Sequence, residues 1–226
     1  MLTTPISAPQ RRGKFIVFEG LDRSGKSTQA ERLVDTLRGY GQKVEHMRFP
    51  NRSTAIGQMI SSYLSGLSQQ EDHVIHMLFS ANRWELASTI EDALYAGRTV
   101  VVDRYYYSGC VYSAAKQNPT LSLEWARQPD VGLPRPDLCI FLDISPEEAA
   151  QRGGYGSERY EQQDLQNRVR DLFEQLREHP DEDNDIVVVN ADRPIEDVER
   201  TIRKWVRLAS ERVDMERMPL QHVRPW

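Results

Sequence analysis

The most informative motif for the fold of this chain is Gly20-Leu21-Asp22-Arg23-Ser24-Gly25-Lys26-Ser27-Thr28. It follows the apolar run Phe15-Ile16-Val17-Phe18 and precedes residues 26–38, where apolar residues recur at helical spacing. A strand, a loop of the form G-x-x-x-x-G-K-[ST] and a helix, in that order, are typical of a phosphate-binding loop. Successive backbone N–H groups of such a loop point at an anion, and the positive end of the following helix adds to their field. The sequence therefore predicts a nucleoside-triphosphate site.

The chemistry of this loop assigns a role to two of its side chains. Lys26 is placed to reach the β- and γ-phosphates, and the Ser27 hydroxyl is placed to ligate Mg²⁺. We expect the triphosphate to be held by a set of neighbouring positions, namely Arg23, Ser24, Gly25, Lys26, Ser27 and Thr28.

Beyond the loop, short apolar runs alternate with helix-length amphipathic stretches. Near-continuous β-branched and aromatic runs indicate strands buried on both faces, as in a parallel sheet covered by helices. Helices are expected at 26–38, 72–96, 146–150 and 162–178. The five expected strands are Phe15–Phe18, Val44–Phe49, Thr99–Val102, Leu138–Leu142 and Ile186–Val189. The sequence thus predicts an α/β fold with a five-stranded parallel sheet.

Composition narrows the class of protein. The 226 residues suit one domain, with a core over 14–205 and tails at 1–13 and 214–226. A net charge of -5 argues against binding a nucleic-acid polymer, which needs a basic face. No apolar run approaches the roughly 20 residues of a membrane span. Two cysteines and the absence of an N-terminal apolar segment indicate a cytoplasmic protein, with the nucleus as a second location.

Two places on the chain suggest an acceptor beside the triphosphate. Asp103 and Arg104 end a predicted central strand, where open α/β sheets bind ligands. There Asp103 would hold a Mg²⁺-bound water or orient the acceptor, and Arg104 would clamp phosphates. Alternatively, Asp103 caps the next helix with Arg104 as its ion-pair partner. Phe79 and Arg83 share one helix face and suit a nucleobase, although the pair also suits core packing and a surface charge.

A glycine-rich segment, residues 151–160, interrupts the pattern between two expected helices. Three of its ten residues are glycine, which prevents a stable element. It is either a surface loop or a lid that carries basic side chains over a ligand.

The motifs leave several reactions open. The chain contains no N-K-x-D motif of regulatory GTPases and no L-S-G-G-Q-like signature of transport ATPases. These absences favour phosphoryl transfer to a small acceptor. Alternatives are another nucleoside monophosphate kinase, a deoxynucleoside kinase, or a non-catalytic nucleotide-binding regulator.

Six motifs together resemble those of the eukaryotic-type thymidylate kinases. They are GLDRSGKST (20–28), RFPNRSTAIGQMISSYL (48–64), FSANRWE (79–85), DRYYYSG (103–109), QPDVGLPRPD (128–137) and RGGYGSERYE (152–161). The resemblance covers about residues 14–167 and is weaker beyond. It implies a three-layer P-loop kinase fold with a short lid at about 151–161. It also implies a homodimer, and Mg²⁺-dependent transfer of the ATP γ-phosphoryl group to dTMP in dTTP biosynthesis.

The resemblance also assigns residues. The catalytic set would be Arg23, Lys26, Asp103 and Arg104, with Mg²⁺ on Ser27 and, through water, on Asp103. Arg152 would stack on adenine. Phe79 would stack on thymine, Arg83 would bond its O4 atom, and Asp22 would accept from the 3′-OH. The other expected dTMP contacts are Phe49, Arg52, Leu64, Arg104, Gly109, Tyr112, Tyr160 and Gln166.

Overall fold

The five expected strands form one parallel sheet in the computed structural model, which describes residues 11–152, 159–160 and 162–226. The strand order is β2-β3-β1-β5-β6, so the strand that precedes the phosphate-binding loop lies at the centre. Their bounds are β1 Phe15–Gly20, β2 Val44–Arg48, β3 Thr99–Asp103, β5 Leu138–Asp143 and β6 Ile186–Asn190. The predicted α/β class and five-stranded parallel sheet are confirmed.

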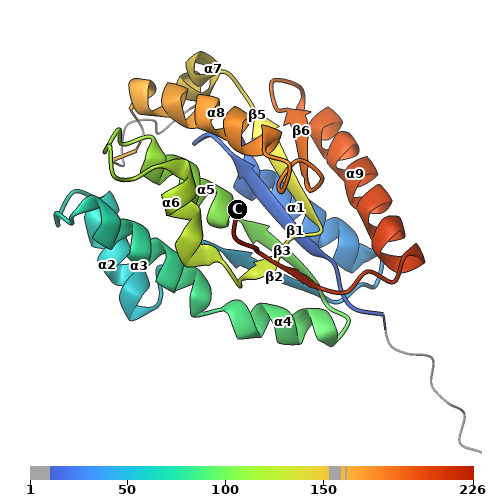
Figure 1. Cartoon of the computed structure of the whole chain (residues 1–226). Coiled ribbons are helices and arrows are strands. Elements are labelled where there is room, and N and C mark those ends of the chain that lie inside the picture. Colours follow the sequence, from blue (N-terminus) through green and yellow to red (C-terminus); the bar gives the residue numbers. More distant parts are fainter. Residues whose placement is uncertain (1–10, 153–158, 161) are drawn as a thin grey trace, which may run out of the picture.

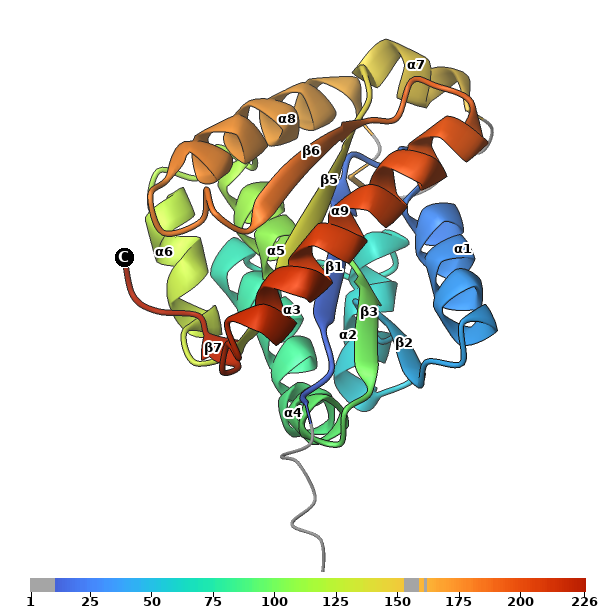
Figure 2. The ribbon, with the colours of Figure 1, turned by 90° about the vertical axis from the view of Figure 1, so that its right-hand side faces the viewer.

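Helices cover both faces of this sheet and give three layers (Figure 1). α1 (Lys26–Gly39) and α9 (Ile195–Met215) lie on one face, in front of the strands in Figure 2, with α3, α5 and α6 behind them. Besides a short 3₁₀ turn at Gln128–Asp130, the remaining helices are α2 Ala55–Leu64, α3 Asp72–Trp84, α4 Ala87–Tyr95, α5 Tyr106–Ala114, α6 Leu123–Arg127, α7 Pro146–Gln151 and α8 Gln163–Glu178.

The apolar runs are buried on both faces only in the interior of the sheet. Every residue of β1 and β3 is buried, as expected for central strands. In β2 only Val44 is buried, and β6 also mixes buried with exposed residues. The expectation of two-sided burial was therefore wrong for these two strands, because both are edges of the sheet.

The single long helix expected over residues 72–96 is in fact two helices. α3 ends at Trp84 and α4 begins at Ala87, with Leu86 in a non-helical conformation between them. The Glu85 carboxylate accepts hydrogen bonds from Asn82 and Thr54 at this break. Neither Gly nor Pro marks the bend, and the helical spacing of apolar residues continues through it, so the sequence pattern shows no break there.

The segment expected to be a C-terminal tail is packed onto the domain. α9 runs on to Met215, and a short strand β7 (Gln221–His222) pairs antiparallel with β4 (Pro134–Arg135). Near the other terminus, Arg12 forms a bidentate ion pair with Asp137. Within the described residues, no helix combines the length and apolar character needed to cross a membrane.

Candidate active site

Two adjoining cavities lie at the carboxyl edge of the sheet. The larger, about 550 Å³, contains the phosphate-binding loop, and the smaller, about 100 Å³, lies between β2, α3 and α5. Four residues line both cavities, namely Asp22, Arg48, Arg52 and Arg104. Six arginines of the described residues line the larger cavity: Arg23, Arg48, Arg52, Arg104, Arg152 and Arg193. This cationic lining suits a polyphosphate.

The phosphate-binding loop has the conformation that its glycines allow. Gly25 has φ 94° and caps the N-terminus of α1, so the positive end of that helix opens into the cavity. Lys26 is buried and donates from Nζ to the Leu21 carbonyl at 2.6 Å. Burial, assisted by the nearby Arg104 charge, lowers the pKa of Lys26 to about 7.

Ser27 and Asp103 meet where the loop approaches the end of β3. The Ser27 hydroxyl donates to Asp103 Oδ2 at 2.5 Å, and Asp103 Oδ1 is buried with no hydrogen-bond partner among the described residues. Asp103 does not cap α5, whose N-cap is Tyr105, and its ion-pair partner is Arg48 at 3.6 Å. The capping alternative is therefore wrong, since the Asp103 carboxylate turns back toward the loop.

A hydroxyl and a carboxylate at this point fit Mg²⁺. This ion takes oxygen ligands and is commonly bound by one or two carboxylates together with substrate phosphates. The described part of the chain has no cluster of three or more His, Cys, Asp or Glu side chains suited to a metal. An ion here would consequently depend on phosphate oxygens as well as on Ser27 and Asp103.

Arg104 connects the two cavities. Its guanidinium pairs with the Asp22 carboxylate and donates to Ser108 Oγ at 2.9 Å. Tyr112 and Gln166 donate to the other carboxylate oxygen of Asp22 at 3.1 and 3.0 Å. Burial alone would raise the pKa of Asp22, but Arg104 and Lys26 outweigh it and the pKa is lowered. Asp22 is therefore an ionised acceptor between the cavities.

Glu19 is a site-supporting residue that sequence reasoning missed. Glu19 binds the backbone directly after Arg104, where the chain is strained. Arg104 has φ 68°, a left-handed conformation that costs a non-glycine residue about 1–2 kcal/mol. The buried Glu19 accepts from the backbone N–H groups of Tyr105 and Ser108 at 2.8 and 3.0 Å, and from the Ser108 hydroxyl. It thus caps α5 from the neighbouring strand. Burial raises the pKa of Glu19, while Arg104 and these donors oppose the rise.

The smaller cavity contains a fixed guanidinium. Arg83 is 2% exposed and donates to Asp130 from Nε at 2.9 Å and from Nη2 at 2.8 Å. A Cβ atom on Gly109 would lie 2.7 Å from Arg83 Nη2, so this position leaves room for the guanidinium. The apolar and aromatic part of the lining is Phe49, Pro50, Leu64, Phe79, Tyr105, Tyr112 and Tyr160. Flat apolar walls and one oriented donor suit a planar polar ring.

The expected lid lies partly outside the described residues, which omit 153–158 and 161. At its start, Arg152 lines the larger cavity and donates to the carbonyls of Arg23 and Ala191 at 3.0 and 2.9 Å. Near its end, Arg159 lies over the Tyr63 ring at 4.2 Å and donates to the Tyr63 carbonyl. Arg152 therefore faces the phosphate-binding loop, whereas Arg159 lies against Tyr63 of α2.

Most of the sequence-predicted residues meet at the two cavities. All six loop positions and Arg152 line the larger one, and most of the acceptor set lines the smaller one. Asp103 and Gln166 line neither cavity. Asp103 accepts from Ser27 of the loop, and Gln166 accepts from the Asp22 backbone N–H and donates to the Asp22 carboxylate. Arg193 and Asp130 were not in the expected set. Asp130 lies in the QPDVGLPRPD motif, whereas Arg193 follows β6 in a segment that resembles the family only loosely.

Comparisons with known proteins agree with this geometry. The family model described as thymidylate kinase matches residues 18–202. A thymidylate kinase from Arabidopsis thaliana is 50% identical over 200 residues, covering 88% of this chain and 73% of its own length. The Homo sapiens thymidylate kinase is 49% identical over 193 residues, covering 85% and 89%.

A solved structure extends the likeness to the whole fold. Thymidylate kinase from Candida albicans superposes with a TM-score of 0.82 at 35% identity, covering 95% of this chain and 99% of that one. The phosphate-binding loop, the adjoining acceptor cavity and these matches lead to one assignment: this chain belongs to the thymidylate kinase family.

Proposed function

We propose that this chain transfers the γ-phosphoryl group of ATP to dTMP, giving ADP and dTDP for dTTP biosynthesis. The observation that carries the proposal is the junction of the two cavities. Arg104, Arg52 and Asp22 line both, so groups bound on either side meet at this junction. Phosphoryl transfer between two anions depends mainly on positioning and charge neutralisation.

ATP would occupy the larger cavity. The loop backbone and Lys26 would hold its phosphates, with Ser24, Gly25, Ser27 and Thr28 contributing further donors. Arg152, held between the carbonyls of Arg23 and Ala191, would stack on adenine. Arg23 would then neutralise charge that develops between donor and acceptor.

dTMP would occupy the smaller cavity. Phe79 would stack on thymine, and Arg83 would donate to its O4 atom from the position that Asp130 fixes. Asp22 would accept from the 3′-OH, and Tyr112 would lie under the deoxyribose. Arg52 and Arg104 would grip the phosphate. Contacts are further proposed for Phe49, Leu64, Gly109, Tyr160 and, through Asp22, Gln166.

Mg²⁺ is the proposed metal, with the Ser27 hydroxyl as its ligand and Asp103 binding through water. When bound, it supplies positive charge at the phosphates. Asp103 would orient this arrangement rather than remove a proton, since the dTMP phosphate is already a nucleophile.

We also propose that the chain forms a single domain, with its core over 14–205 and a lid at about 151–161. Closure of that lid would exclude water from the γ-phosphoryl group.

The acceptor class is tested by comparing dTMP, dUMP, dCMP, dGMP and thymidine in a coupled assay of ADP release. We expect dTMP to have the highest kcat/KM and thymidine to be inactive, because Arg52 and Arg104, which both line the two cavities, require an acceptor phosphate. Efficient thymidine phosphorylation would instead indicate a deoxynucleoside kinase. Nucleotide binding without turnover on any acceptor would indicate a regulator.

We further propose a homodimer that associates through α2 and α3. Met59, Val74 and Met77 are 47%, 40% and 48% exposed on these two helices, which pack against each other, and exposed apolar side chains on adjoining elements suit an interface. Light scattering should give twice the chain mass, and Met77→Asp should give the monomer; a monomeric wild type would refute this.

The proposed location is the cytoplasm, with the nucleus as a second site. Cys110 and Cys139 are both free and buried, which suits a reducing compartment. Imaging of a fluorescent fusion tests this proposal.

A further inference from the structure

Asp130, which accepts two hydrogen bonds from the Arg83 guanidinium, belongs to a segment that the C-terminal residues of the chain hold in place. Asp130 is fully buried and accepts two hydrogen bonds from Arg83 and a third, at 2.8 Å, from Ser80. It ends the 3₁₀ turn after α6, within residues 127–135, here called the brace. The position of the Arg83 guanidinium thus depends on the position of the brace.

On its inner side the brace contacts the elements that carry the acceptor cavity. The Pro129 carbonyl accepts from Ser80 Oγ at 3.1 Å and from Trp84 Nε1 at 2.8 Å, both on α3. The Pro134 carbonyl accepts from the Tyr105 hydroxyl at 3.1 Å. A displacement of the brace would consequently disturb both α3 and Tyr105, the residue that follows Arg104.

On its outer side the brace is held by residues 220–226, here called the C-terminal strap. Gly132 N–H donates to the Val223 carbonyl at 2.8 Å, and Val223 N–H donates to Leu133 at 2.9 Å. Strand pairing of β4 with β7 continues this ladder. The Val223 side chain is 2% exposed, so the strap is part of the core.

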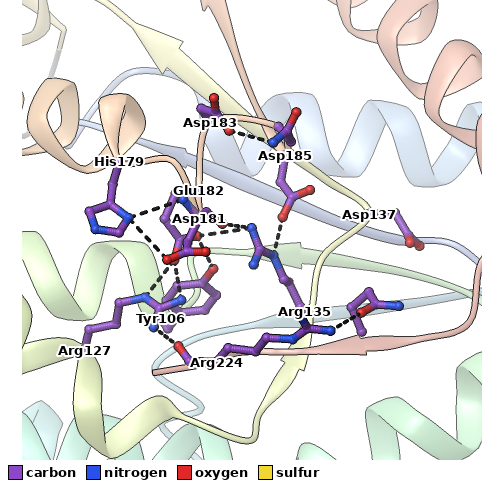
Figure 3. Close-up of polar contacts among 12 residues, drawn as sticks. Tyr106, Arg127, Arg135, Asp137, His179, Asp181, Glu182, Asp183, Asp185 and Arg224 are labelled. Carbon is purple, nitrogen blue, oxygen red and sulfur yellow. Dashed lines mark hydrogen bonds and ion pairs between the residues drawn. The ribbon is translucent and has the colours of Figure 1, made fainter. Parts of the chain in front are cut away.

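A buried ion pair joins the brace, the strap and the loop between α8 and β6 (Figure 3). Arg127 and Glu182 are both fully buried, with Arg127 Nε donating to Glu182 Oε1 at 2.7 Å. Arg127 also donates to the Arg224 carbonyl. The Tyr106 hydroxyl donates to Glu182 Oε2 at 2.7 Å. The Trp226 ring covers Arg127 at 4.8 Å.

Such an ion pair is weak evidence for stability, because desolvation offsets much of the attraction and apolar replacements are often as stable. Its directional hydrogen bonds do, however, specify one arrangement of the three segments it joins. The element they orient is the brace. Its Asp130 does not line the acceptor cavity itself, but it holds Arg83, which does.

We propose that the C-terminal strap and the Arg127–Glu182 pair are positioning elements for base recognition, holding Asp130 so that Arg83 keeps its orientation in the acceptor cavity. This inference rests on the proposed function, since it concerns the acceptor contact of that same reaction. Glu182 and Trp226 touch no substrate; they act through the brace.

The test compares Glu182→Gln and the milder Trp226→Ala with the wild-type chain in steady-state kinetics. We expect the dTMP KM to rise about tenfold in Glu182→Gln and about threefold in Trp226→Ala, with kcat and the ATP KM changed less than about twofold. Val206→Ala is the control, because Val206 packs in the core from α9 on the opposite face of the sheet. It should lower the Tm without raising the dTMP KM.

A double-mutant cycle of Glu182→Gln with Asp130→Asn distinguishes positioning from general destabilisation. If Glu182 acts through Asp130, the double variant should have the dTMP KM of Asp130→Asn within about twofold. Three results would overturn this inference and leave the proposed function intact. The effects of the two substitutions on the dTMP KM could multiply, the ATP KM could rise as much as the dTMP KM, or Val206→Ala could raise the dTMP KM to the same extent. Wild-type turnover of dTMP is measured first, and its absence would overturn the proposed function itself.

Discussion

The Ser27 hydroxyl donates to Asp103 Oδ2 at 2.5 Å and thereby joins the phosphate-binding loop to the end of β3. The other oxygen of Asp103 is buried and has no hydrogen-bond partner in the described part of the chain. An unpartnered buried carboxylate oxygen is costly unless a further group satisfies it. Mg²⁺ and its water, bound with the nucleotide, would supply that group.

Asp103→Asn should therefore lower kcat roughly 100-fold and raise the Mg²⁺ concentration needed for half-maximal activity. The measurement is a Mg²⁺ titration of ADP release at saturating ATP and dTMP. Asp143→Asn is the matched control, since Asp143 also ends a sheet strand but pairs with Arg170 of α8. An unchanged Mg²⁺ dependence in Asp103→Asn would contradict the assignment.

Arg23→Ala should lower kcat roughly 100- to 1,000-fold while changing the dTMP KM less than about threefold. Arg23 belongs to the phosphate-binding loop and lines the larger cavity, where its charge would act on the transition state more than on the bound acceptor. Single-turnover measurement of dTDP formation checks this. Arg203→Ala, on the exposed side of α9, should match the wild type. A wild-type kcat in Arg23→Ala would exclude Arg23 as a catalytic residue.

Gly109→Ala should raise the dTMP KM at least about tenfold and leave ATP binding unchanged. The added methyl group would lie 2.7 Å from Arg83 Nη2, and Asp130 prevents the guanidinium from moving aside. Gly39→Ala provides the comparison, because an added Cβ there meets nothing within 4 Å. Equal dTMP KM values in the two variants would show that Arg83 does not contact the acceptor.

Above pH 7, the protein should take up protons when it binds ATP. The pKa of Lys26 is lowered to about 7 by burial and by Arg104, so much of the free protein carries a neutral Lys26 at pH 8. Phosphates favour the charged form and raise this pKa, so ATP affinity should fall as pH rises from 7 to 9. Calorimetry at pH 8 in buffers of different ionisation enthalpy measures the uptake. Lys26→Arg should abolish it; an equal uptake in that variant would assign the proton elsewhere.

The sequence predicted those parts of the molecule that local patterns determine. The phosphate-binding loop, the five strands and α1 follow from residue type and spacing over a few positions. The break between α3 and α4 escaped prediction, because side chains from elsewhere in the fold stabilise it. A local period contains no information about such partners.

The same distinction applies within the site. Lys26, Asp103 and Arg104 are placed by their own strands and loops, whereas Asp130 reaches Arg83 across 47 positions of sequence. Glu19 did leave a signal, since it is the one charged residue in a strand that is otherwise apolar or glycine. A buried charge of this kind needs donors from neighbouring elements, and here they come from the start of α5.

Phosphoryl transfer to dTMP is measured directly by ³¹P NMR of the products after incubation of the chain with ATP, dTMP and Mg²⁺. The proposed transfer predicts dTDP and ADP in equal amounts, with no inorganic phosphate above the level of a no-enzyme control. Formation of ADP and inorganic phosphate without dTDP, or no consumption of ATP, would contradict it.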